Sequence, residues 1–226
     1  ALAKGLATIT TAWVGAVGGY LALAESTRET RTQLNQIEPS FTKAGFSAEQ
    51  STETYNELFG VLGDSGKATE ASLHMAQLAK SEEDLSNWTT IATGVYSRFG
   101  DSLPTENLME ASNETAKTGK LTGVLTDALN WAGVSEDEFK AKLDACTTEQ
   151  ERQALITDTL NGLYKESAEA YRENNKEVIE AQKAQQNLTN ATAKLGEIAE
   201  PIMTSLKSAF AGLVTSITPF VELIGD

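Results

Sequence analysis

The sequence predicts an all-α protein, and three observations support that fold class. Only 4 of the 226 residues are proline, so long stretches of chain are free to be helical. Those stretches are dominated by alanine, leucine, glutamate, lysine and glutamine, the residues with the strongest helix propensity. The alternation of β-branched or aromatic residues with polar ones that marks strands is hard to find. We expect a compact multi-helix domain, a long coiled-coil-like helix toward the C-terminus, and apolar terminal helices.

The first predicted segment spans residues 1–39, apolar at the start and polar afterwards. Residues 5–24 carry no charge and are about as long as a bilayer-spanning helix needs to be. Their threonines and glycines make the stretch only weakly hydrophobic, and it does not resemble a signal peptide. Small residues at 15–19 permit close helix packing, so contact with a membrane and packing against protein are both open. We expect the polar helix that follows to end at Pro39.

A compact helical domain is predicted over residues 40–147, because signals for helix starts recur there. Ser47 with Gln50 forms a capping box, while Ser81 and Ser135 each precede acidic residues that suit the first turn of a helix. Pro104 is placed to open another helix. Glycines are expected to end helices, at Gly60, Gly63, Gly66, Gly100, Gly119 and Gly133. The predicted core is Leu58, Leu62, Leu73, Leu78, Leu85, Trp88, Ile91, Val95, Tyr96, Phe99, Leu108, Leu121, Leu125, Leu129, Trp131, Phe139 and Leu143.

One long amphipathic helix is predicted over residues 148–200, opened by Thr147 or Thr148 with Gln150 and Glu151. Apolar residues mark its first face, at Leu155, Leu160, Leu163, Tyr164 and Ala168. A heptad seam with several polar inner positions continues from there, through Tyr171, Asn174, Val178, Ala181, Gln185, Leu188, Thr192 and Leu195. No turn signal interrupts the stretch, so we expect a straight rod of roughly 70 Å.

The last segment, residues 201–226, is predicted to be an apolar helix. It carries few charges, and its apolar residues share one helical stripe that must be buried against copies of itself, another protein or lipid. The predicted contacts with a partner or with other copies are Tyr171, Val178, Ala181, Leu188, Leu195, Ile202, Leu206, Phe210, Leu213 and Ile217.

Charge and the pattern of reactive residues exclude several classes of function. The formal net charge is −14, and no basic stripe is present to bind a phosphate backbone, so direct recognition of nucleic acid is not expected. The single histidine, His74, and the single cysteine, Cys146, form no metal-ligand pattern. The glycines around Lys67 do not match a phosphate-binding loop. We expect no cofactor, no metal and no enzymatic activity.

The acidic triplets at residues 82–84 and 136–138 are the remaining candidates for catalytic groups. Each follows a serine that suits a helix N-cap, so stabilisation of the helix dipole explains them better than paired-carboxylate chemistry. Cys146 lacks a suitable basic activator, since the one histidine lies far away in the sequence.

Four stretches of the sequence together resemble the tail tape measure proteins of bacteriophages and prophages. They are Asn-Leu-Met-Glu-Ala-Ser-Asn-Glu-Thr-Ala-Lys-Thr-Gly at 107–119, Ala-Leu-Asn-Trp-Ala-Gly-Val-Ser-Glu-Asp-Glu-Phe at 128–139, Ala-Tyr-Arg-Glu-Asn-Asn-Lys at 170–176 and Ala-Lys-Leu-Gly-Glu-Ile-Ala-Glu-Pro at 193–201. The last has the Leu-Gly-x4-Pro ending that follows a long helix and precedes an apolar one in that family.

The resemblance implies a structural scaffold in the lumen of the tail tube. Copies of such a protein, three or six, set tail length, contact the tail tube, the tail tip or baseplate and tail assembly chaperones, and leave ahead of the DNA. Assembly takes place in the bacterial cytoplasm, and the apolar segments 5–24 and 201–224 are candidates for entering the host membrane. Family members are much longer, and this chain begins at an alanine, so we expect it to be a section of such a protein.

Two other classes of function are compatible with the sequence. A pore-forming or membrane-active helical toxin also combines long helices with apolar segments, and would permeabilise membranes as a purified protein. A cytosolic helical adaptor would account for the polar seam but leaves the apolar ends unexplained.

Overall fold

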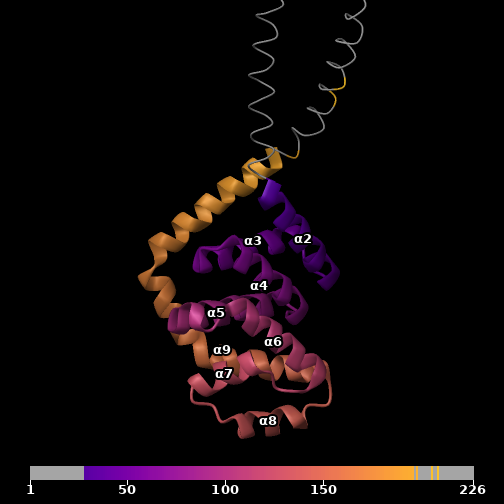
Figure 1. Ribbon diagram of the computed structural model, residues 1–226, viewed down its shortest axis with the longest axis vertical. Helices are drawn as coiled ribbons and strands as arrows, with labels where there is room; N and C mark the ends of the chain where they lie inside the picture. Colours follow the sequence, from indigo (N-terminus) through magenta and orange to yellow (C-terminus); the bar gives the residue numbers. More distant parts are fainter. Residues whose placement is uncertain (1–27, 196, 198–204, 206–207, 209–226) are drawn as a thin grey trace, which may run out of the picture. The chain divides into compact units, whose positions relative to one another are not determined.

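The computed structural model describes residues 28–195, 197, 205 and 208, and confirms the all-α fold class over this part of the chain (Figure 1). Every regular element in the described residues is helical, and none is a strand. The elements are α2 (Arg28–Ala44), α3 (Ala48–Leu62), α4 (Ser65–Leu78), α5 (Glu82–Phe99), the 3-10 turn η1 (Gly100–Ser102), α6 (Thr105–Thr118), α7 (Gly123–Trp131), α8 (Glu136–Ala145) and α9 (Glu149–Asn174).

Past Asn175 the chain is helical again over residues 176–195. The chain divides into two compact units, residues 33–187 and residues 1–32 with 188–226. We call residues 176–187, the part of this last helix that belongs to the first unit, the arm. None of the described helices is both long enough and apolar enough to cross a bilayer.

Helix α9 lies inside the compact unit, which corrects the predicted boundary at residue 147. It packs along α5 and also against α6, and its apolar residues Ile156, Leu160 and Tyr164 are completely buried. The amphipathic face of α9 is therefore a core face of the same chain. The predicted straight rod is also wrong, because the helix is interrupted at Asn175.

Gly94 of α5 permits the close packing of α5 on α9. A Cβ atom at this position would lie 2.2 Å from the backbone oxygen of Tyr164 and 2.8 Å from its Cβ. No side chain larger than hydrogen fits at such a separation, so the two helix backbones meet here. The pair is further tied by Asn161, whose Nδ2 donates to Oδ1 of Asn87 at 3.0 Å.

The predicted helix starts are confirmed, because each depends on contacts within one turn. Ser47 and Thr148 both make complete capping boxes, with Gln50 and Glu151. The side chains of Ser81 and Ser135 accept backbone N–H groups three residues later. Helix α6 begins directly after Pro104.

Several predicted helix ends are wrong, because glycine and proline also occur inside helices. Pro39 lies within α2, between the buried side chains of Ile37 and Phe41 that hold the helix on the core. Gly60 and Gly66 lie within α3 and α4. The ends predicted at Gly63, Gly100 and Gly119 are confirmed, and Gly133 follows the end of α7; all four have positive φ.

The predicted core is confirmed at most positions. Leu73, Tyr96, Phe99 and Leu121 are partly buried and pack against the core. Trp131 is the exception, with 47% of its surface exposed; its ring meets that of Phe99 edge to face, with the centroids 5.1 Å apart. The core also includes large buried side chains that were not predicted: Ile37, Phe41, Tyr55, Met75, Met109, Ile156, Leu160 and Tyr164.

Candidate functional site

The arm lies against α3, and Gly60 makes the contact possible. A Cβ atom on Gly60 would lie 2.9 Å from Cγ of Lys183 and 3.3 Å from Cγ2 of Ile179. Ile179 is the one large apolar side chain that the arm buries. The side chain of Gln182 lies 3.1 Å from the corresponding position on Gly63. The last turn of α3 is therefore shaped to receive a helix.

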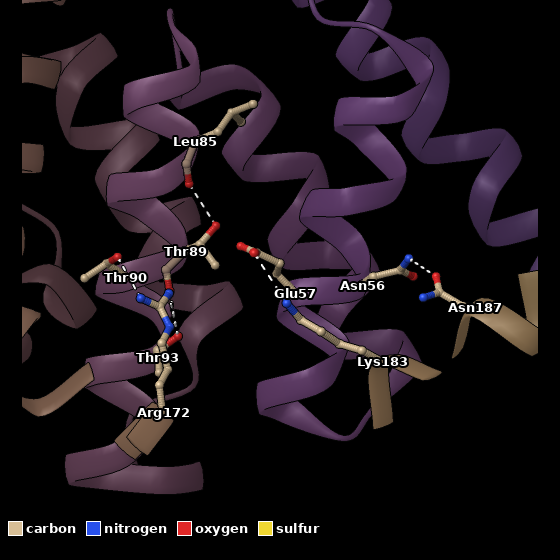
Figure 2. Close-up of polar contacts among 9 residues, drawn as sticks. All are labelled: Asn56, Glu57, Leu85, Thr89, Thr90, Thr93, Arg172, Lys183 and Asn187. Atoms are coloured by element: carbon tan, nitrogen blue, oxygen red, sulfur yellow. Dashed lines mark hydrogen bonds and ion pairs between the residues drawn. The ribbon is translucent and has the colours of Figure 1, made fainter. Parts of the chain in front are cut away.

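Two polar pairs join the arm to α3 (Figure 2). Nδ2 of Asn56 donates to Oδ1 of Asn187 at 2.7 Å. Nζ of Lys183 lies 3.4 Å from Oε1 of Glu57, and both side chains are about one-third exposed. An ion pair with this exposure contributes little to stability, so its main effect is to fix the register of the arm along α3.

The last turn of α9 is anchored on α5 by the guanidinium of Arg172 (Figure 2). Its Nη1 donates to Oγ1 of Thr90 at 3.3 Å and its Nη2 to Oγ1 of Thr93 at 3.5 Å. Tyr171 beside it meets Tyr96 edge to face at 6.0 Å. The chain thus stays attached to α5 up to the interruption at Asn175.

A cleft of about 360 Å³ lies between the arm, the end of α9, α3 and α5. Its lining is Glu57, Val61, Ser86, Thr89, Arg172, Lys176, Ile179, Glu180 and Lys183. A neighbouring cleft of about 280 Å³ shares Glu57, Ser86 and Thr89 with it and is otherwise lined by Gln50, Glu53, Thr54, Glu82 and Leu85. The arm therefore contributes two lysines and one glutamate to a surface whose α3 and α5 walls carry carboxylates.

The lining of the two clefts is made of carboxylates, lysines, an arginine, hydroxyls, an amide and a few apolar side chains. The hydroxyl of Thr89 donates to the backbone oxygen of Leu85 at 2.8 Å. The cleft contains no histidine or cysteine. Over the described residues, no three His, Cys, Asp or Glu side chains are grouped so that they could hold a metal ion.

His74 and Cys146 lie apart from both clefts, whereas Glu82 of the first acidic triplet lines the smaller one. His74 is half-buried within α4. The thiol of Cys146 lies 3.5 Å from the backbone oxygen of Lys142, at the end of α8. The two acidic triplets occupy the first turns of α5 and α8, as expected from their serine N-caps.

The predicted seam residues lie mostly on the surface of the described chain. Val178 is 56% exposed, Leu188 69% and Leu195 60%, and Ala181 is exposed as well. Only Tyr171, half-buried against Tyr96, has a ring partner within the chain. The other predicted contacts, Ile202, Leu206, Phe210, Leu213 and Ile217, lie outside the described residues.

The buried positions of the helix over 176–195 follow a different stripe from the predicted one. They are Ile179, Gln186, Asn190 and Ala193. The predicted seam followed the best apolar spacing in the sequence. In the structure, the buried residues instead form a more polar stripe next to that seam. The available signal for the contact of Ile179 was Gly60, which lies within α3 and leaves room for the arm.

A scan against protein-family models, a search of curated proteins and a search of solved structures each found no match to this chain.

Proposed function

We propose that this chain is a section of a bacteriophage or prophage tail tape measure protein, with a structural role and no catalytic one. The observation that supports this most is the exposed stripe of Val178, Ala181, Leu188 and Leu195 on a helix outside the core. These residues are spaced by three, seven and seven, which keeps them on one face for contact with another helix. Such a stripe is costly in water and useful in an assembly.

A helix suits a length-setting role because each residue adds a fixed rise of about 1.5 Å. Residues 149–195 are helical apart from Asn175, and would measure roughly 70 Å if straight. The net charge of −14 would keep the scaffold from adhering to outgoing DNA in the same tube. Neither property requires a cofactor or a bound nucleic acid.

The proposed partners are other copies of the chain, three or six in number, together with the tail tube, the tail tip or baseplate and the tail assembly chaperones. The protein would be made in the host cytoplasm and carried in the lumen of the virion tail. Residues 5–24 and 201–224 are the proposed segments for contact with the host membrane during ejection.

Removing two heptads of the parent gene, residues 177–190, tests the length-setting role. We expect tails shorter by about 21 Å, since 14 residues of helix span that length and all parallel copies shorten together. Duplicating the same residues should lengthen tails by an equal amount and serves as the matched control. Tail lengths measured by electron microscopy that are the same in deletion, duplication and parent phages would refute the role.

Replacing Leu188 by glutamate tests the proposed stripe. A charge at the centre of a helix seam requires desolvation without a partner, so we expect association of the purified chain at high concentration to be strongly weakened. Sedimentation equilibrium measures it. Gln150→Glu, an exposed position in the first turn of α9, adds the same charge away from the stripe and should associate like the parent. Equal association of the two variants would argue against the stripe as a contact.

A further inference from the structure

We infer that the arm can be exchanged between two copies of this chain, so that residues 176–187 of one copy dock on α3 of another. The contacts needed are already present within one chain: Ile179 over Gly60, Lys183 with Glu57, and Asn187 with Asn56. Exchange of an identical element between copies reuses the same contacts and requires no new surface. The partner is therefore a second copy, and the receiving site is the last two turns of α3.

The hinge for this exchange is Asn175. Its dihedral angles are φ −116° and ψ 18°, outside the α-helical region. The helical bonds on both sides persist, since the N–H of Asn175 donates to the oxygen of Tyr171 at 2.9 Å and that of Ile179 to the oxygen of Asn175 at 3.0 Å. In the exchange that we infer, rotation at this one residue converts α9 and the arm into a continuous helix that carries the arm away from its own α3.

The side chain of Asn175 stabilises the bent form. Its Nδ2 donates to the backbone oxygen of Tyr171 at 3.0 Å, alongside the main-chain bond to the same oxygen. Asparagine has a lower helix propensity than alanine, because its side chain competes for backbone groups in this way. Asn175→Ala is therefore expected to favour the straight helix.

The arm is held less firmly than the helix it extends. The arm buries one large apolar side chain, Ile179, while Val178 is 56% exposed, and its ion pair with Glu57 is partly exposed. By contrast, α9 buries Ile156, Leu160 and Tyr164 in the core. Undocking the arm thus leaves the body of the unit intact.

Charge favours the return of an arm to any copy of α3. The arm and the end of α9 line the cleft with Arg172, Lys176, Glu180 and Lys183, and Lys176 lies 3.9 Å from Glu180 on the arm itself. The attraction between the arm and α3 therefore comes from Lys183 and Glu57, whose charged atoms lie 3.4 Å apart. In dilute solution the arm of the same chain prevails, because a short connection holds it at an effective concentration on the order of millimolar. Exchange becomes competitive when copies are packed at comparable concentrations.

This inference goes beyond the proposed function, and its test uses only the purified 226-residue chain. Each variant carries Cys146→Ser so that no other thiol is present. Chains with Glu57→Cys alone and chains with Lys183→Cys alone, distinguishable in mass, are incubated together over rising concentration and treated with a short bismaleimide. Crosslinked heterodimers measure arms docked on another copy. In a chain that carries both substitutions, the internal crosslink measures arms that are docked on their own α3.

We expect heterodimers that increase with concentration, to several times the yield of a control mixture of Glu57→Cys with Lys140→Cys chains. Lys140 is an exposed lysine on α8 that is likewise ion-paired, with Asp144. Adding Asn175→Ala should raise the heterodimer yield further. The inference is overturned if the mixture gives no more heterodimer than the control, if Asn175→Ala leaves the yield unchanged, or if the doubly substituted chain fails to crosslink internally. The tail-length experiment tests the proposed function, and its result does not depend on the result of this crosslinking experiment.

Discussion

Replacing Gly94 by alanine is expected to destabilise the folded unit more than any other single-methyl addition in the described chain. The new Cβ would lie 2.2 Å from the backbone oxygen of Tyr164, and a helix backbone cannot yield as the end of a flexible side chain can. Helices α5 and α9 would have to separate along their whole contact. We expect a loss of about 3 kcal/mol in the free energy of unfolding, measured by urea denaturation.

Gly162→Ala is the matched control, since it makes the same chemical change on the partner helix. Gly162 is exposed on α9, and nothing lies within 4 Å of the position its Cβ would take. Alanine should stabilise the helix there by about 0.5–1 kcal/mol, because glycine loses more backbone freedom on folding. If both variants were equally stable, the close contact of α5 with α9 would be contradicted.

Raising the pH from 10 toward 12 is expected to destabilise the protein through Tyr164. Its hydroxyl donates to the backbone oxygen of Ala128 in the last turn of α7. Burial raises the pKa of this phenol to about 12, with the Arg98 guanidinium acting in the opposite direction. A folded-state pKa above the unfolded value means that the stabilisation is complete below pH 10 and is lost as the pH rises through the folded value. The loss is on the order of 2 kcal/mol.

The Tyr164→Phe variant isolates this effect from other groups that titrate at alkaline pH. At neutral pH it should be about 1–2 kcal/mol less stable than the parent, because the Ala128 oxygen loses its donor in a buried place. Between pH 10 and 12 its stability should fall less steeply than that of the parent. Urea denaturation at several pH values measures both slopes, and parallel curves would contradict the buried role of the Tyr164 hydroxyl.

What the sequence predicted correctly depends on contacts within a turn or two. The capping boxes at Ser47 and Thr148 involve residues three positions apart, so the whole interaction is visible in a short window. The glycine after α6, Gly119, lies in the left-handed region, φ 70°, which a side chain would disfavour. Helix starts, several helix ends and the all-α class follow from such local information.

Predictions that needed contacts across the chain were wrong for a common physical reason. Pro39 and Gly60 weaken a helix by local criteria, but buried neighbours and a close helix contact outweigh that cost. Trp131 is apolar enough for the core, yet it is the last residue of α7 and is 47% exposed. The apolar face of α9 was recognised, but periodicity alone does not say whether such a face covers the same chain or another one.

Only part of the candidate site could be predicted from the sequence. The seam through Val178, Leu188 and Leu195 was identified as a surface for a partner, and its exposure in the described chain is compatible with that hypothesis. The arm contact with α3 was missed, because it uses Ile179 and polar residues such as Asn56 and Asn187, which no hydrophobic repeat selects. Gly60, at the centre of that contact, was interpreted as a helix end.

The pairing of α5 with α9 also determines when this protein can fold during its synthesis. Asn87 and Asn161, which bond across the pair, are separated by 74 positions in the chain. The part of α5 that α9 covers therefore stays open while the ribosome adds α6, α7 and α8. Until α9 emerges, the core lacks Ile156, Leu160 and Tyr164, and the growing polypeptide needs protection from premature aggregation for that interval.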